Sequence, residues 1–144
     1  MQESADKAQH AAYKHVLGTK AVPKTFDKWQ ELKYNDSEKW AELKKQYGFK
    51  RRIKKVNKTE LTAEPFAVTE VESKKGGISR NYYDENGRQT KQISNNSHGH
   101  KAVEDYGKHG EHAHDYTWED DGNLTGRPYR ELTDDERKEN SDIL

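Results

Sequence analysis

Five of the seven histidines of this 144-residue chain lie within seventeen consecutive residues, and their side chains are the best suited to chemistry. Imidazole binds divalent metal ions and exchanges protons near neutral pH. If residues 112–118 form a strand, alternate side chains share one face, which places His112 beside His114. Such a pair can bind one metal ion, with further ligands from the same cluster. The candidate ligands, for zinc in the first place, are His98, His100, His109, His112 and His114.

The same histidines suit acid–base catalysis, which is the second interpretation of the cluster. A metal-free ribonuclease needs a general base, a general acid and a cation that stabilises the phosphorane. His112 and His114 can be the acid and the base, with Arg127 or Arg130 as the cation. A third use is a protonation switch, because several imidazoles gain charge as the pH falls from about 7 to about 5.5. The simplest interpretation is structural, with the imidazoles in hydrogen bonds, stacked on aromatic rings or in solvent.

Two hairpin signatures provide the elements that position this cluster. Residues 78–94 have strand-like sequence on both sides of Asp84-Glu85-Asn86-Gly87, and residues 116–127 on both sides of Asp120-Asp121-Gly122-Asn123. Asn-Gly and Asp-Gly supply the positive φ that tight hairpins need. Because one hairpin is marginally stable in water, we expect the two to form a four-stranded antiparallel sheet. The capping box Thr133–Glu136 then begins a short helix that ends at about Asn140.

The N-terminal part of the chain has the pattern of helices. Residues 4–17 can form a helix that ends at Gly18. Residues 23–48 predict an α-hairpin, in which a capping box at Asn35–Glu38 begins the second helix and Gly48 ends it. The aromatic and aliphatic residues of this hairpin either fill its core or form an exposed docking face. The candidates for a protein interface are Trp29, Leu32, Trp40 and Leu43.

Together these segments predict an α+β chain with three parts. Residues 1–48 form the helical segment with its α-hairpin. Residues 49–77 form a basic linker that includes a short strand at 66–72. Residues 78–144 form a small domain of two β-hairpins and a short C-terminal helix.

The chain is poor in apolar residues. The hydrophobic fraction is 29%, against roughly 45–50% in an ordinary globular chain. A large self-sufficient core is therefore excluded, and we expect a partner to order the chain throughout. The longest apolar runs have three or four residues, whereas a membrane span needs about 20. No apolar segment follows Met1, so we expect neither a secretory signal nor a membrane partner, and the absence of cysteine excludes disulfides, thiolate zinc sites and cysteine nucleophiles.

Charge is unevenly distributed, although 26 basic and 26 acidic residues cancel. Eight bases and no acid lie between Lys44 and Lys58. Such a run can neutralise phosphates and bind nucleic acid without sequence preference. The alternative is a solvated helix end followed by a flexible linker. The candidates for nucleic-acid binding are Lys50, Arg51, Arg52, Lys54 and Lys55.

Three stretches resemble proteins of phage heads. FDKWQELKYNDSEKW at 26–40 is similar to a segment near the C-terminal end of minor head (head morphogenesis) proteins of phages and prophages of Gram-positive bacteria. GEHAHDY at 110–116 and RELTDDERK at 130–138 resemble short C-terminal modules attached to such proteins or encoded beside them. The resemblance implies an accessory protein of head assembly, or a freestanding C-terminal module, in the bacterial cytoplasm or the virion. Some such modules look like toxins, which also implies a nuclease.

The thin core and the phage-like stretches favour a non-enzymatic accessory protein that binds a phage or host protein through the helical hairpin. The alternative from another class is a small nuclease that uses His112 and His114, with or without a metal ion. A third hypothesis is a nucleic-acid-binding module that uses the basic run. The sequence predicts no cofactor other than zinc, for which the histidine cluster is the candidate site.

Overall fold

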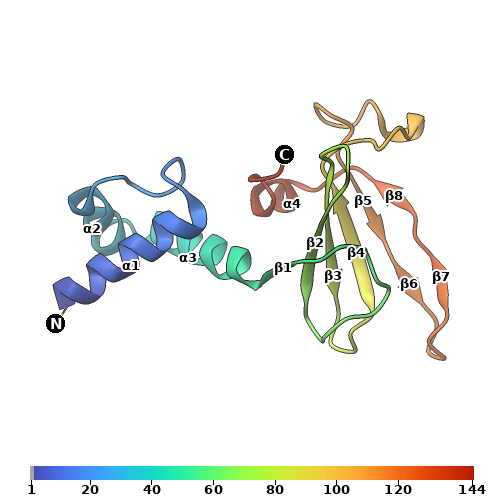
Figure 1. Ribbon diagram of the computed structural model, residues 1–144, viewed down its shortest axis with the longest axis horizontal. Coiled ribbons are helices and arrows are strands. Elements are labelled where there is room, and N and C mark those ends of the chain that lie inside the picture. Colours follow the sequence, from blue (N-terminus) through green and yellow to red (C-terminus); the bar gives the residue numbers. More distant parts are fainter. Residues whose placement is uncertain (1) are drawn as a thin grey trace. The chain divides into compact units, whose positions relative to one another are not determined.

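The computed structural model describes residues 2–144, which divide into two compact units (Figure 1). The first unit, which ends at Arg52, consists of helices. The second, from Ile53 to Leu144, contains the strands, a 3-10 turn and a C-terminal helix. The chain is therefore α+β with a mostly antiparallel sheet, as predicted. Within residues 2–144, no helix combines the length and apolar character needed to cross a membrane.

Three helices make up the helical unit: α1 (Gln2–Leu17), α2 (Phe26–Asn35) and α3 (Ser37–Arg52). The end of α1 before Gly18 confirms the sequence prediction. The second predicted cap is displaced by one residue, because the Asp36 side chain, and not that of Asn35, accepts a hydrogen bond from the Lys39 amide at 3.1 Å. Gly48 does not end the hairpin as predicted. It lies inside α3, where the buried Phe49 follows it and the helix continues to Arg52.

The aromatic residues of the predicted hairpin form the core of the helical unit. Trp29 is 0% exposed and Leu43 is also buried, together with Tyr13 of α1. The Tyr13 ring stacks on Trp40 with ring centroids 5.3 Å apart. The interpretation of Trp29 and Leu43 as an exposed docking face is therefore wrong, because α1 packs against the hairpin and buries both side chains.

Polar contacts fix α1 to the rest of the helical unit. The buried Asp6 carboxylate accepts hydrogen bonds from the Lys33 ammonium at 2.8 Å and from the Tyr34 hydroxyl at 2.6 Å. These contacts lower the pKa of Asp6 to about 2, with the Lys33 hydrogen bond as the largest cause. One turn further, His10 Nε2 lies 2.7 Å from the Pro23 carbonyl oxygen.

The main sheet of the second unit, the sheet unit, has six strands. In spatial order they are β1 (Ile53–Lys55), β2 (Val68–Glu72), β3 (Ile78–Tyr83), β4 (Gln89–Ser94), β5 (His112–Asp115) and β8 (Tyr129–Arg130). The β1–β2 pair is parallel and the other neighbours are antiparallel. A separate two-stranded sheet joins β6 (Thr117–Trp118) to β7 (Leu124–Gly126). The helical pieces are η1 (Lys101–Val103) and α4 (Asp134–Glu139).

The two predicted hairpin segments lie in different sheets. β3 pairs with β4, and β6 pairs with β7. The prediction of one four-stranded sheet is wrong, because β5 occupies the second edge of β4, with Ala113 opposite Ile93. The capping box that begins α4 is confirmed: Thr133 accepts from the Glu136 amide, and Glu136 accepts from the Thr133 amide.

The range 49–77, predicted as a basic linker, contains regular structure. Residues 50–52 are the last of α3, and Ile53–Lys55 form β1. Ile53 pairs with Val68 in β2, which is 1% exposed. Because Val68 is buried in the sheet unit, the boundary between the two units falls after Arg52 rather than after Gly48.

Candidate functional site

The register of the sheet separates two faces of different chemistry. α4 and its flanks cover the face that carries Tyr82 and Ile93, where Ile93, Ala113 and Leu132 form the apolar core. Alternate residues point to the opposite side. We call this side the histidine face and define it by Thr69, Ser79, Asn81, Gln92, Ser94, His112, His114 and Tyr129, which are neighbours across β2, β3, β4, β5 and β8. Val71 of β2, opposite Ser79, also lies on this side, but polar side chains dominate the face opposite the apolar core.

Three imidazoles gather on the histidine face. The ring centroids of His112 and His114 lie 5.1 Å apart, as the alternation in a strand predicts. The ring of His98, from the loop after β4, lies 6.1 Å from that of His112. His112 is only 2% exposed, whereas His114 is half-buried and His98 is exposed. Solvent therefore reaches His98 and His114, and His112 lies under them.

Hydrogen bonding distinguishes the two strand histidines. His112 Nδ1 lies 2.9 Å from the Gly110 carbonyl oxygen, which can only accept, so Nδ1 carries a proton. His114 Nδ1 is buried without a hydrogen-bond partner. Loss of water at the ring lowers the pKa of His114, and electrostatic interaction with His112 and Arg127 lowers it further. An imidazolium donates from both nitrogens, so the lone Nδ1 also favours the neutral ring.

His98 is held in an uncommon conformation. Its φ of +51° is in the left-handed region, where residues other than glycine are rare. The Asn96 side chain accepts a hydrogen bond from the His98 amide at 2.9 Å. Loss of water at the ring lowers the pKa of His98, followed by the charges of His112 and His100. Such backbone strain concentrates at functional sites.

The loop that supplies His98 is anchored by Glu111. The buried Glu111 carboxylate accepts hydrogen bonds from the Lys108 and His109 amides at 3.2 and 2.9 Å, and from Arg137 at 2.9 Å. Burial alone would raise the pKa of Glu111, but these donors lower it to about 2. Gly107, with φ +54°, lies so close that a Cβ there would collide with the carboxylate. Glu111 thus joins the loop to α4 directly before β5 begins.

A buried amide network lies beside the imidazoles. Asn81 is 0% exposed, and its Oδ1 accepts from Gln89 and from Gln92, each at 2.9 Å. Gln92 is directly opposite His114 across β4 and β5. These residues were not among the site residues predicted from the sequence. Alternating polar residues in two expected strands, such as Ser79 with Asn81 and Gln92 with Ser94, were the available signal.

The two arginines proposed as the catalytic cation are separated by the register. Arg130 is opposite Ala113 and therefore lies on the covered face. Its guanidinium donates to Asp115 at 2.7 Å and to Glu136 at 2.7 and 2.8 Å, contacts that raise its pKa. Arg130 is thus not available to the histidines. Arg127 is exposed, and its charge acts on His114.

The predicted zinc site does not form. In the described part of the chain, residues 2–144, no group of three or more histidine, cysteine, aspartate or glutamate side chains is placed to hold a metal ion. His100 and His109 are exposed in the loop, and the remaining three imidazoles form ring contacts. The five predicted ligands are therefore not gathered into one site, and zinc binding by fewer of them stays a prediction.

The predicted basic run is divided between the two units. Lys50, Arg51 and Arg52 end α3 in the helical unit, and Lys54 and Lys55 belong to β1. Arg51 lies over the Tyr47 ring at 5.5 Å, and Lys54 is 3.9 Å from Glu64. Nucleic-acid binding by these residues stays a prediction.

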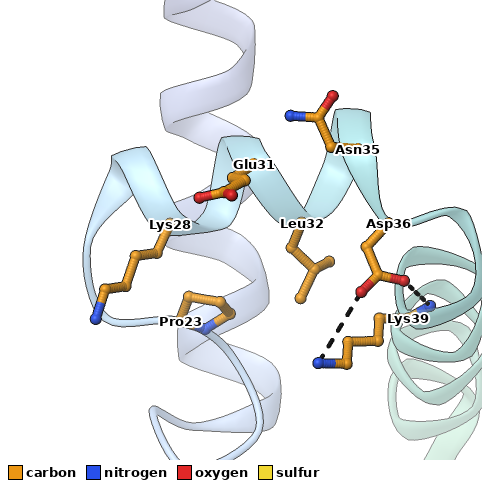
Figure 2. A pocket seen from close by; sticks show the side chains of 7 residues that line it. All are labelled: Pro23, Lys28, Glu31, Leu32, Asn35, Asp36 and Lys39. Carbon is orange, nitrogen blue, oxygen red and sulfur yellow. Dashed lines mark hydrogen bonds and ion pairs between the residues drawn. The ribbon is translucent and has the colours of Figure 1, made fainter.

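A surface hollow of about 350 Å³ lies on the helical unit (Figure 2). Leu32, one of the predicted interface residues, extends into it near Pro23. The Asp36 carboxylate and the Lys39 ammonium, 3.9 Å apart, close one side. The remaining lining residues are Lys28, Glu31 and Asn35. The hollow has few apolar side chains, and charged side chains of both signs surround them. This lining does not indicate one class of ligand.

Comparisons with protein-family models, with curated proteins and with solved structures found no match.

Proposed function

We propose that the sheet unit cleaves RNA by acid–base catalysis at the histidine face. The observation that carries this proposal is the group of three imidazoles, with ring centroids 5.1 and 6.1 Å apart, on a polar face backed by the apolar core. In the reaction, the ribose 2′-oxygen attacks the adjacent phosphorus, and the 5′-oxygen of the next nucleotide leaves. One imidazole takes the 2′ proton and another protonates the leaving oxygen.

His114 is the general base in this proposal. A base must be neutral at the working pH, and the lowered pKa of His114 favours the neutral ring. Because Nδ1 is buried, Nε2 is the nitrogen of this half-buried ring that takes the proton in the proposal. The base assignment thus depends on protonation state and access together.

His98 is the general acid, and His112 is a positioning residue. His98 is exposed, whereas His112 is buried between the two outer imidazoles. The Gly110 carbonyl fixes the His112 ring, and His98 and His114 pack against that ring. The exposed Arg127 is the cation that offsets charge on the phosphorane.

Of the other functions expected from the sequence, docking through the helical hairpin has less support. Trp29 and Leu43 cannot contact a docking partner, because both side chains belong to the core of the helical unit. A phage setting, whether the virion or the bacterial cytoplasm, stays a prediction, as does a role in head assembly.

The proposal is tested with a fluorogenic single-stranded RNA, with chelator and with zinc, alongside the same sequence in DNA. We expect the wild-type chain to cleave RNA with chelator present and to leave DNA intact, because DNA lacks the 2′-hydroxyl. His114→Gln should reduce kcat/KM about 100-fold or more. His15→Gln, at an exposed position of α1, is the matched control and should equal the wild type. Full activity in His114→Gln, or no RNA cleavage by the wild type in any condition, contradicts the proposal.

A further inference from the structure

We propose that the hollow beside His98 binds phosphate groups of the RNA strand next to the cleaved bond, an inference that rests on the proposed function for its substrate. The hollow has a volume of about 550 Å³. It lies between the β2–β3 turn and the loop after β4 and is lined by Ser73, Lys74, Lys75, Asn96, Ser97, His98 and Gly99. Because His98 both lines the hollow and contacts His112, the hollow adjoins the imidazole group.

The lining chemistry selects an anion. None of the lining residues is acidic, and hydroxyl, amide and imidazole groups accompany two ammonium groups. Lys74 and Lys75 are exposed, and neither forms an ion pair with a carboxylate in the part of the chain that the structure describes. Two unpaired lysines side by side are unusual in residues 73–144, which have four more acidic than basic residues. Phosphate, with several acceptor oxygens, matches this set of donors.

Gly77 allows the two sides of the hollow to approach each other closely, because it has no side chain. A Cβ on Gly77 would lie 2.7 Å from Asn96 Nδ2 and 3.2 Å from His98 Cε1. The Ser73 hydroxyl accepts from the Gly77 amide at 3.0 Å, and the Gly77 carbonyl accepts from the Ser73 amide at 2.8 Å. The turn that carries the lysines is therefore ordered directly against His98. An RNA strand whose cleaved phosphate lies at the histidines can place a neighbouring phosphate in this hollow.

The experiment measures binding of a single-stranded 2′-O-methyl oligonucleotide to the full chain by fluorescence anisotropy at several salt concentrations. This probe has the phosphates but lacks the attacking hydroxyl, so binding is separated from cleavage. For the Lys74→Gln/Lys75→Gln variant we expect about tenfold weaker binding near 0.1 M salt. The slope of log Kd against log salt should fall by about 1.4, as two lost phosphate contacts imply for a single strand.

Two further variants control this test. Lys20→Gln/Lys24→Gln removes two exposed lysines of the helical unit and should leave Kd and slope unchanged. Lys54→Gln/Lys55→Gln removes part of the predicted basic run. If that variant alone weakens binding, or if Lys74→Gln/Lys75→Gln binds like the wild type, the phosphate subsite is wrong.

Cleavage kinetics separate this inference from the proposed function. With a cleavable RNA, Lys74→Gln/Lys75→Gln should raise KM about tenfold with kcat unchanged, since the lysines do not touch the reacting atoms. A chain that binds through Lys74 and Lys75 but never cleaves RNA would overturn the nuclease and support the subsite. A chain that cleaves RNA with no contribution from these lysines would overturn the subsite alone.

Discussion

Two effects, burial and electrostatic repulsion, both lower the pKa of His114. Removal of water disfavours the charged imidazolium, and electrostatic interaction with His112 and Arg127 disfavours it further. The Asp115 carboxylate acts in the opposite direction but comes last among the causes. In the strand register, Asp115 is on the other face, where it pairs with Arg130.

The pH dependence of cleavage follows from these directions. The pKa values of His98 and His114 are both below the ordinary 6.5, so both rings are mostly neutral at pH 7. Catalysis needs one ring neutral and the other protonated. The rate should therefore rise as the pH falls below 7, and then fall once the base is protonated. We expect a bell-shaped profile of kcat/KM with its optimum below about pH 6.5.

Arg127 provides the check on this assignment. Arg127→Gln removes a positive charge that lowers the pKa of His114. The pKa assigned to the general base in the pH profile of kcat/KM should therefore increase. Lys138→Gln, at an exposed position of α4, is the control and should not move either limb. An optimum above pH 7, or an Arg127→Gln profile identical to that of the wild type, is incompatible with the assigned roles.

At the scale of elements, Arg80 joins β3 to the chain after α4. Arg80 is 0% exposed and donates to Glu70 at 2.9 Å, to Asn140 at 3.0 Å and to Asp142 at 2.6 Å. A buried guanidinium needs such partners because desolvation of an unpaired charge is costly. The pairing holds the C-terminal segment on the face opposite the histidine face.

Replacement of Arg80 should therefore destabilise the sheet unit. Arg80→Met leaves the buried Glu70 carboxylate without this partner, and we expect a loss of about 3–5 kcal/mol in the free energy of unfolding. Hydrogen exchange of the β3 and β4 amides measures that loss within the sheet unit. Arg127→Met, at an exposed position, should stay within about 0.5 kcal/mol of the wild type. A similar small effect for Arg80→Met would show that its ion pairs do not stabilise the sheet.

At the scale of the whole molecule, each unit has a core of its own. Tyr13, Val22, Trp29 and Leu43 form that of the helical unit, and Ile93, Ala113 and Leu132 that of the sheet unit. Both cores are small, which agrees with the low apolar content of the sequence. Polar and ionic contacts therefore supply much of the specificity in each unit, and the units should respond separately to changes in solution.

Acid should unfold the helical unit through Asp6. The pKa of Asp6 falls from 3.8 to about 2 in the folded chain. A carboxylate with a lowered pKa stabilises the fold above its ordinary pKa, and this stabilisation is lost as the pH falls from about 4 to about 2. We expect the NMR signals of the Trp29 and Trp40 indoles to lose their native dispersion over that range.

Asp6→Asn tests the cause of this acid response. The variant should be less stable than the wild type at pH 7 and should lose less additional stability between pH 4 and 2. Asp27→Asn, at an exposed position of α2, serves as the control with a wild-type response. Equal acid responses in wild type and Asp6→Asn would exclude the Lys33 and Tyr34 contacts as the source.

The sequence by itself determined the features that depend on neighbours along the chain. Thr133 and Glu136 cap α4, Gly18 follows the last residue of α1, and the alternation of a strand places His112 beside His114. Each of these follows from backbone geometry within a few residues. For the same reason, the helices were predicted to within a few residues of their ends.

Tertiary structure alone decided the features that join distant segments. Whether Trp29 faced solvent or core depended on α1, and the separation of Arg130 from the histidines depended on the pairing of β8 with β5. His98 reached His112 through a loop anchored by Glu111, and Asn81 acquired its role from Gln92 in the next strand. Such pairings depend on which edges and faces meet after the chain folds back, and local sequence patterns do not contain that information.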